Sequence, residues 1–176
     1  TMDSTDQKPE LCGETMTTEK NDSTNHLPAV LQVKRLRETG VLPVRLTQGS
    51  IGYDLSVIED RLIPAHGRAA VPLGISIRVP DGTYGRIAPR SELAMRGIDV
   101  GAGVIDPDFA GEIAVIFYNH SFEDYTFKAG ERIAQLILEQ ALVVPVVLEE
   151  APGECCLIVE PKPRKRGAMG FGSTGR

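Results

Sequence analysis

Two carboxylates flank a proline in the stretch GAGVIDPDFAGEI at 101–113. A carboxylate held beside a reacting phosphorus centre can act as a general base and activate water. The small residues that open this stretch would let a flat ligand approach the backbone closely. Asp-Pro-Asp is also an ordinary turn sequence, so residue type alone leaves a catalytic and a structural role open for Asp106 and Asp108.

Two further stretches combine groups that bind anions. In PRSELAMRG at 89–97, Arg90 and Ser91 stand at a predicted helix start, where a guanidinium, a hydroxyl and backbone N–H groups form an anion site. A serine N-cap is the structural alternative. The stretch RGAMGFGSTGR at 166–176 carries arginine, hydroxyls and one aromatic ring among glycines, but it lacks the Gly-Lys-Ser/Thr of a Walker A loop. We expect it to be a flap that orders over a ligand.

Two polar residues interrupt apolar runs. Asp54 lies in GYDLSV at 52–57, and Gln135 lies in AGERIAQLIL at 129–138. A buried carboxylate is unfavourable unless it is paired or near a cation, and a buried amide needs hydrogen-bond partners or a ligand. Both residues are therefore site candidates, although Asp54 could also be a strand-end residue that faces solvent.

The sequence predicts that short β-strands position these residues. Apolar and polar residues nearly alternate in AAVPLGISIRVP at 69–80, and PDG at 80–82 and KAG at 128–130 are typical turns. Many short strands between turns predict an all-β sandwich or barrel, with at most one short helix near 91–97. The apolar stretch 132–148 predicts buried strands broken at Pro145 and partly covered by another subunit.

The 176 residues indicate one domain with tails. The polar segment 1–26 cannot bury enough surface to order itself, so we expect a disordered tail there. A β-domain at 27–150, a linker at 151–165 and a flap at 166–176 complete the predicted organisation.

Composition narrows the class of function. A net charge of −5 argues against stable nucleic-acid binding, and no apolar run is long enough to span a membrane. The three cysteines, Cys12, Cys155 and Cys156, have no metal-site spacing. Free thiols predict a reducing compartment, the cytoplasm and/or the nucleus.

In order and spacing, the five stretches resemble the five motifs of the trimeric dUTPase family. Those motifs are G-Y-D-L, P-R-S-G-L-A, G-V-I-D-x-D-Y-R-G, G-D-R-I-A-Q-L-I and R-G-x-G-G-F-G-S-T-G, and the resemblance runs from about Leu31 to Arg176. It implies a jelly-roll-like β-barrel that forms a homotrimer with active sites shared between chains. It also implies hydrolysis of dUTP to dUMP and pyrophosphate, which keeps uracil out of DNA and supplies dUMP for thymidylate synthesis.

The resemblance also assigns roles. Asp106 would activate the attacking water and contact the sugar 3′-hydroxyl, Phe109 would pack under the deoxyribose, and Asp54 would hold Mg²⁺ through water. The uracil edge would be read by the backbone of Gly101, Ala102, Gly103, Val104 and Ile105. The triphosphate would be held by Arg90, Ser91 and Gln135. The nucleotide would be covered by Arg166, Phe171, Gly172, Ser173 and Thr174, with the Phe171 ring on uracil.

Three departures from the family motifs bear on efficiency. Glu92 stands beside the triphosphate site where the family usually has glycine, and it would repel the phosphates unless it points away. Phe109 replaces the usual tyrosine, and Met169 replaces a glycine of the flap.

Two alternatives belong to other classes. A dCTP deaminase has the same fold, but we expect it to lack the G-F-G-S-T-G flap, and it would release ammonia. A non-catalytic interaction module would not need these polar residues together.

Overall fold

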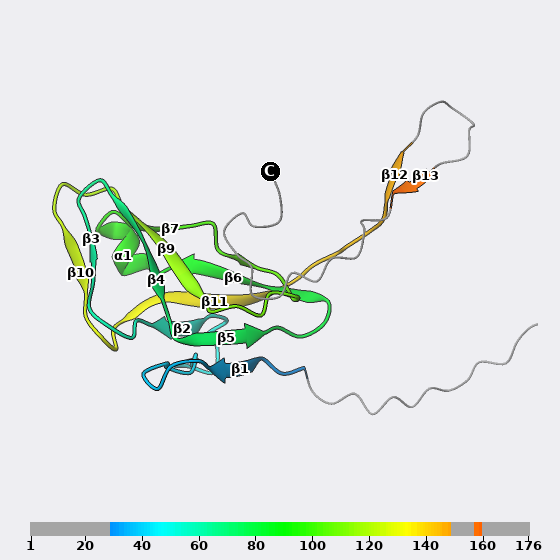
Figure 1. Cartoon of the computed structure of the whole chain (residues 1–176), viewed down its shortest axis with the longest axis horizontal. Coiled ribbons are helices and arrows are strands. Elements are labelled where there is room, and N and C mark those ends of the chain that lie inside the picture. Colours follow the sequence, from blue (N-terminus) through cyan, green and yellow to red (C-terminus); the bar gives the residue numbers. More distant parts are fainter. Residues whose placement is uncertain (1–28, 149–156, 160–176) are drawn as a thin grey trace, which may run out of the picture.

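The computed structural model describes residues 29–148 and 157–159. Within these residues the chain is almost entirely β-structure, which confirms the all-β prediction, and its one helix is short (Figure 1). The elements are β1 (Gln32–Arg35), β2 (Tyr53–Ser56), β3 (Arg61–Ile63), β4 (Arg68–Pro72), β5 (Ile75–Arg78), β6 (Thr83–Pro89), α1 (Ser91–Met95), β7 (Ile98–Gly101), β8 (Val104–Ile105), β9 (Ala114–Asn119), β10 (Tyr125–Phe127), β11 (Arg132–Gln140), β12 (Val146–Leu148) and β13 (Leu157–Val159).

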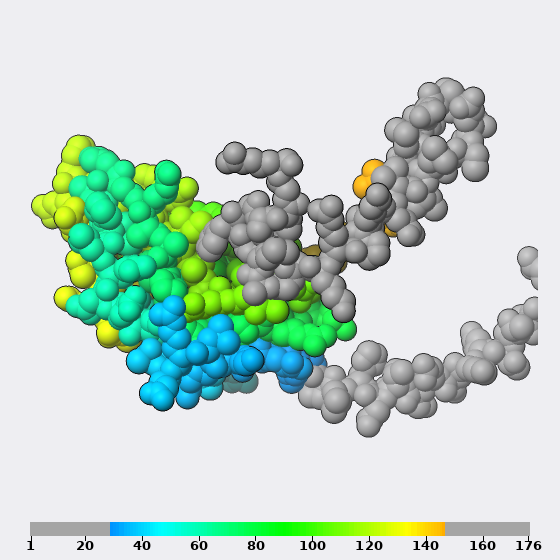
Figure 2. Space-filling view, in the orientation of Figure 1, coloured from blue at the N-terminus to red at the C-terminus, as the bar shows by residue number. Residues whose placement is uncertain are grey.

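Two antiparallel sheets form the body of the jelly-roll-like fold. One has the strand order β2-β11-β6-β8 and the other has the order β4-β9-β7, while β1-β5 and β10-β3 form smaller ladders. A single core cluster draws on both sheets and includes Leu55 and Leu136 from the first and Val115 and Phe117 from the second. Strand β1 (blue in Figure 2) forms an exposed border of this body. No helix in the described part of the chain has the length and apolarity needed to cross a membrane.

Strand β11 lies at the centre of the larger sheet and sets the register of the polar candidates. Gln135 lies opposite Asp54 of β2 on one side and Ala88 of β6 on the other. The register with β2 shifts between Arg132 and Ala134, which marks a β-bulge at the beginning of the strand. The strand pairing therefore brings the motif stretches at 52–57, 89–97 and 129–138 to one region of the sheet.

The turn between β7 and β8 requires an unusual backbone. Ala102 and Gly103 both have positive φ angles, of 56° and 98°. A Cβ on Gly103 would lie 2.6 Å from the carbonyl oxygen of Ile87, so only glycine fits there. A left-handed alanine costs roughly 1–2 kcal/mol, and such strain is typical of sites where the backbone conformation has a function.

The end of the described chain differs from the prediction. Strand β11 ends at Gln140 rather than continuing to Pro145, and the side chains of Leu142 and Val143 are about 90% and 89% exposed. The segment 151–165, expected to be a linker, contains β13, whose apolar residues pair with β12. The polar tail predicted at 1–26 and the flap predicted at 166–176 lie outside the described residues.

Candidate active site

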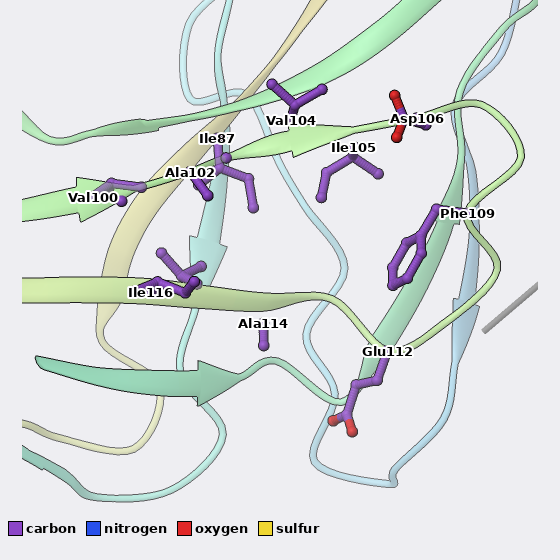
Figure 3. Close-up of a pocket in the computed structure, with 13 residues that line it drawn as sticks. Ile87, Val100, Ala102, Val104, Ile105, Asp106, Phe109, Glu112, Ala114 and Ile116 are labelled. Atoms are coloured by element: carbon purple, nitrogen blue, oxygen red, sulfur yellow. The ribbon is translucent and has the colours of Figure 1, made fainter. Parts of the chain in front are cut away.

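A pocket of about 230 Å³ opens beside β7, β8 and the loop that connects them (Figure 3). Its lining is mostly small or apolar, and it brings together seven of the predicted site residues. The lining residues among the candidates are Gly101, Ala102, Gly103, Val104, Ile105, Asp106 and Phe109, from the end of β7, the β7–β8 loop, β8 and the following turn. The ring of Phe109 points into the pocket below Asp106. A flat, weakly polar group fits such a lining.

Backbone hydrogen bonds to β6 hold the wall of this pocket that is formed by β8 and the β7–β8 loop. The amide of Ile87 donates to the carbonyl oxygen of Gly103 at 2.7 Å, and β8 pairs with β6 through Ile105 opposite Gly85. Together with the left-handed backbone of Ala102, these bonds constrain the loop between β7 and β8. Preorganised backbone of this kind can select a ligand by the edge that it presents.

Asp106 is the carboxylate best placed in the pocket. Its carbonyl oxygen accepts a hydrogen bond from the Phe109 amide at 3.1 Å, so the Asp-Pro-Asp stretch is a turn and also a pocket wall. Asp108 is exposed and does not line the pocket. Glu112 lines it, but its carboxylate oxygens accept hydrogen bonds from the Gly74 amide at 3.0 Å and from Arg37 at 3.1 Å. Its carboxylate also points away from Asp106 (Figure 3).

A second group of site candidates surrounds the beginning of β11, and we call Asp54, Arg90, Arg132 and Gln135 the polar cluster. Arg132 Nη1 donates to Asp54 Oδ2 at 3.0 Å. Arg90 Nη1 donates to the carbonyl oxygen of Arg132 at 2.6 Å, and Gln135 Nε2 donates to the carbonyl oxygen of Pro89 at 3.1 Å. Asp54 is therefore not a solvent-facing strand-end residue, because its mostly buried carboxylate is paired with a guanidinium.

Two contributors to the polar cluster were missed by reasoning from the sequence. A Cβ on Gly52 would lie 2.3 Å from Gln135 Oε1, so this glycine makes room for the amide side chain. The glycine of the first motif was a signal, but its meaning depends on a strand pairing that the sequence does not display. Arg132 begins an apolar run, and nothing in the sequence around it indicates that it pairs with Asp54.

Helix α1 places Ser91 and Glu92 beyond the end of β6. Arg90 occupies the N-cap position without a side-chain cap, so the serine N-cap alternative is wrong. Glu92 is exposed and pairs with Arg96 at 3.0 Å, one turn further along the same helix. The carboxylate that departs from the family motif thus has a cationic partner of its own, which offsets its charge.

The far end of β11 carries a different polar group. Tyr84 donates a hydrogen bond to Glu139, and Arg86 Nε donates to Glu139 Oε1 at 2.7 Å. These bonds from Tyr84 and Arg86 hold the pKa of Glu139 below its ordinary value, and the same bond raises the pKa of Tyr84. This group does not line the pocket, so we assign it to the fold.

The pocket and the polar cluster remain separate within one chain, because Asp54, Arg90 and Gln135 do not line the pocket. The described residues also contain no group of three or more His, Cys, Asp or Glu side chains that could hold a metal ion. Asp54 alone can contribute to a metal site only if water or a bound ligand supplies the remaining oxygens. The candidates Arg166, Phe171, Gly172, Ser173 and Thr174 lie outside the described residues.

Comparisons with known proteins define the family. The dUTPase family model matches residues 38–175. The chain is 54% identical over 146 residues to the deoxyuridine 5′-triphosphate nucleotidohydrolase of Paramecium bursaria Chlorella virus 1, covering 82% of this chain and 97% of that protein. It is 50% identical to the protein of that name from Arabidopsis thaliana, over 82% of each.

Solved structures agree on the fold. The dUTPase from phage phi11 of S. aureus superimposes with a TM-score of 0.66 at 18% identity, over 72% of this chain and 99% of that chain. The native EIAV dUTPase gives a TM-score of 0.60 at 25% identity, over 72% of this chain and 100% of that chain. The chain belongs to the dUTPase family.

Proposed function

We propose that this chain hydrolyses dUTP to dUMP and pyrophosphate, with Asp106 as the general base. The observation that carries this proposal is the position of Asp106 and Phe109 on the wall of a small, mostly apolar pocket, in a chain of the dUTPase family. Uracil and deoxyribose occupy that pocket, where the backbone from Gly101 to Ile105 reads the base edge and the Phe109 ring packs under the sugar.

The chemistry is a water attack on the α-phosphorus. The Asp106 carboxylate takes a proton from water while the water oxygen bonds to phosphorus. The bond from phosphorus to the oxygen that bridges the α- and β-phosphates breaks, and pyrophosphate leaves with the electron pair. Such reactions depend mainly on in-line positioning and on neutralising the phosphate charge, and Arg90, Ser91 and Gln135 supply those contacts.

We infer that the working unit is a homotrimer in which one chain's pocket meets another chain's polar cluster. The separation of these two groups of residues within one chain supports this inference. A second support is the exposed apolar segment after β11, where the side chains of Leu142, Val143, Val144 and Val146 are 62–90% exposed. Exposed apolar surface of this kind marks an interface in most soluble proteins.

The polar cluster could bind Mg²⁺ together with the substrate triphosphate. One phage phi11 dUTPase structure is described as coordinating a structural Mg(II) ion. In this chain Asp54 would hold the ion through water, together with phosphate oxygens of the substrate, because Mg²⁺ commonly keeps several waters and binds substrate phosphates. When bound, the ion neutralises phosphate charge that develops on the leaving group.

The segment 166–176 completes the site in this proposal. Arg166, Ser173 and Thr174 contact the γ-phosphate, and Phe171 stacks on uracil with Gly172 beside it. Closing such a flap excludes water from the phosphates and strengthens each charged contact.

Product analysis tests the proposal and its nearest alternative. Purified chain incubated with dUTP and Mg²⁺ should release one pyrophosphate for each dUMP formed, and UTP, dCTP and dTTP should be poor substrates. Asp106→Asn protein is the matched control for contaminating phosphatases. Release of ammonia from dCTP would support the deaminase instead, and absence of any turnover would support the non-catalytic module.

A further inference from the structure

Arg132 contacts two other members of the polar cluster through two different groups. Its guanidinium donates to Asp54 Oδ2 at 3.0 Å, and its backbone carbonyl oxygen accepts the hydrogen bond from Arg90 Nη1 at 2.6 Å. One residue thus holds both the carboxylate and the cation that the proposed function assigns to the metal and the triphosphate. Only the first of these contacts depends on the Arg132 side chain.

The β-bulge in β11 explains how Arg132 reaches Asp54. Arg132 lies opposite Ser56 and Ala134 lies opposite the adjacent Leu55, so β11 contains one extra residue at this point. The next two side chains after Arg132 are both fully buried, which breaks the alternation of a regular strand. Bulges commonly redirect a side chain beside a functional site, and here the bulge leaves the Arg132 side chain half-exposed beside β2.

The guanidinium of Arg132 compensates the charge of the Asp54 carboxylate. The side chain of Asp54 is only 17% exposed and that of Arg132 is 40% exposed. A carboxylate so far removed from water is unfavourable without a cation, and it would also repel a triphosphate that approaches Arg90. The guanidinium of Arg132 offsets that negative charge while no metal ion is present.

We propose that Arg132 is a positioning residue that acts as the internal counter-ion of Asp54, so that the polar cluster accepts a nucleotide before Mg²⁺ arrives. This inference rests on the proposed function. Once Mg²⁺ is bound, the ion itself compensates Asp54 and the contribution of Arg132 becomes small. Arg132 therefore matters most for the metal-free nucleotide complex.

The test is calorimetric binding of the dUTP analogue dUpNHpp to the full chain, in EDTA and in saturating Mg²⁺. Arg132→Gln removes the charge but keeps the backbone carbonyl that holds Arg90. We expect it to weaken binding roughly fivefold in EDTA and less than about twofold in Mg²⁺. Arg132→Lys, which keeps the charge, should restore most of the metal-free affinity.

The Asp54→Asn background separates compensation from direct phosphate contact. With no carboxylate to compensate, adding Arg132→Gln should change the metal-free affinity by less than about twofold. This double variant also removes both charges of the ion pair, so no uncompensated carboxylate is left to destabilise the fold. A loss that persists in this background would overturn the inference.

Arg61→Gln is the matched control variant. The side chain of Arg61 is also 40% exposed, and it pairs with Glu59 and donates to the carbonyl oxygen of Ala70, away from the cluster. It should leave dUpNHpp binding unchanged in both buffers. Equal losses for Arg132→Gln with and without Mg²⁺ would overturn the inference alone, whereas wild-type chain that binds no dUpNHpp would overturn the proposed function as well.

Discussion

The pocket and the polar cluster differ in polarity and in the groups that form them. The pocket is mostly apolar, and one of its walls is the backbone of β7, β8 and the loop between them. The polar cluster is held by side chains, with one ion pair and two hydrogen bonds to the backbone carbonyls of Arg132 in β11 and Pro89 in β6. A nucleoside triphosphate has the same division between a flat base and a charged tail, and in the proposed function the pocket binds the base while the polar cluster binds the phosphates.

The comparison supports the proposal that one chain alone does not form a complete site. The described lining of the pocket contains the proposed general base and no Arg or Lys, while the polar cluster contains Arg90 and Arg132 and lies outside the pocket. Phosphoryl transfer needs both at once. A symmetric assembly can bring one chain's pocket to its neighbour's cluster, so assembly and catalysis become one requirement.

The largest expected effect is a loss of turnover without a loss of nucleotide binding, and it comes from a substitution in the pocket. Asp106→Asn should lower kcat by about 10²–10⁴-fold, because the group that takes the proton from water is lost. Binding of dUpNHpp should stay within a few-fold of wild type, since the side chain keeps its size. Stopped assays of pyrophosphate release and calorimetry measure the two quantities, and near-normal kcat would show that Asp106 is not the base.

A smaller effect is expected from a single methyl group in the polar cluster. Gly52→Ala would place a Cβ 2.3 Å from Gln135 Oε1, so the amide must move away from its present position. We expect KM for dUTP to rise by about three- to tenfold with a smaller change in kcat.

Gly49→Ala is its matched control, because a Cβ at Gly49 has no heavy atom within 4 Å. Steady-state kinetics on the two variants should therefore differ. Equal KM values would show that Gln135 does not hold the triphosphate.

The far end of β11 should respond to pH through stability rather than turnover. Because the pKa of Glu139 is lowered by bonds from Tyr84 and Arg86, its contribution to stability is present above the ordinary value of 4.5 and is lost as pH falls through the lowered pKa. Denaturant titrations from about pH 6 to pH 3 should show wild type losing its advantage over Glu139→Gln. A difference that stays constant over this range would refute the assignment.

The smallest effect concerns the family departure at Glu92. Its exposed carboxylate already pairs with Arg96, so Glu92→Gln should leave KM for dUTP unchanged at low and at physiological salt. The lost pair should cost at most about 0.5 kcal/mol of stability. A clear fall in KM at low salt would mean that Glu92 faces the phosphates.

Much of this architecture is predictable from the sequence because it depends on local patterns. Alternation and turn residues predict β5, β9 and the turn at Gly130, and the motif around Asp106 predicts a pocket wall. The role of Gly52 and the pairing of Arg132 are not predictable, because both depend on a bulged register between strands far apart in sequence. The apolar run 132–148 predicts strands broken at Pro145, whereas β11 ends at Gln140, because apolar character alone does not mark the residue at which a strand ends.

Subunit mixing tests the division of the site between chains most directly. Asp106→Asn damages the pocket and Arg90→Ala damages the polar cluster, and each protein alone should be nearly inactive. The two variants are then unfolded together in equal amounts and refolded, so that chains of both kinds mix at random. A site is intact only where a chain with a normal pocket lies next to a chain with a normal cluster. Each of these conditions is met in half of the cases, so about one quarter of the sites in a cyclic trimer should recover wild-type turnover. If the mixture stays as inactive as its components, pocket and cluster belong to the same chain, and the account is contradicted.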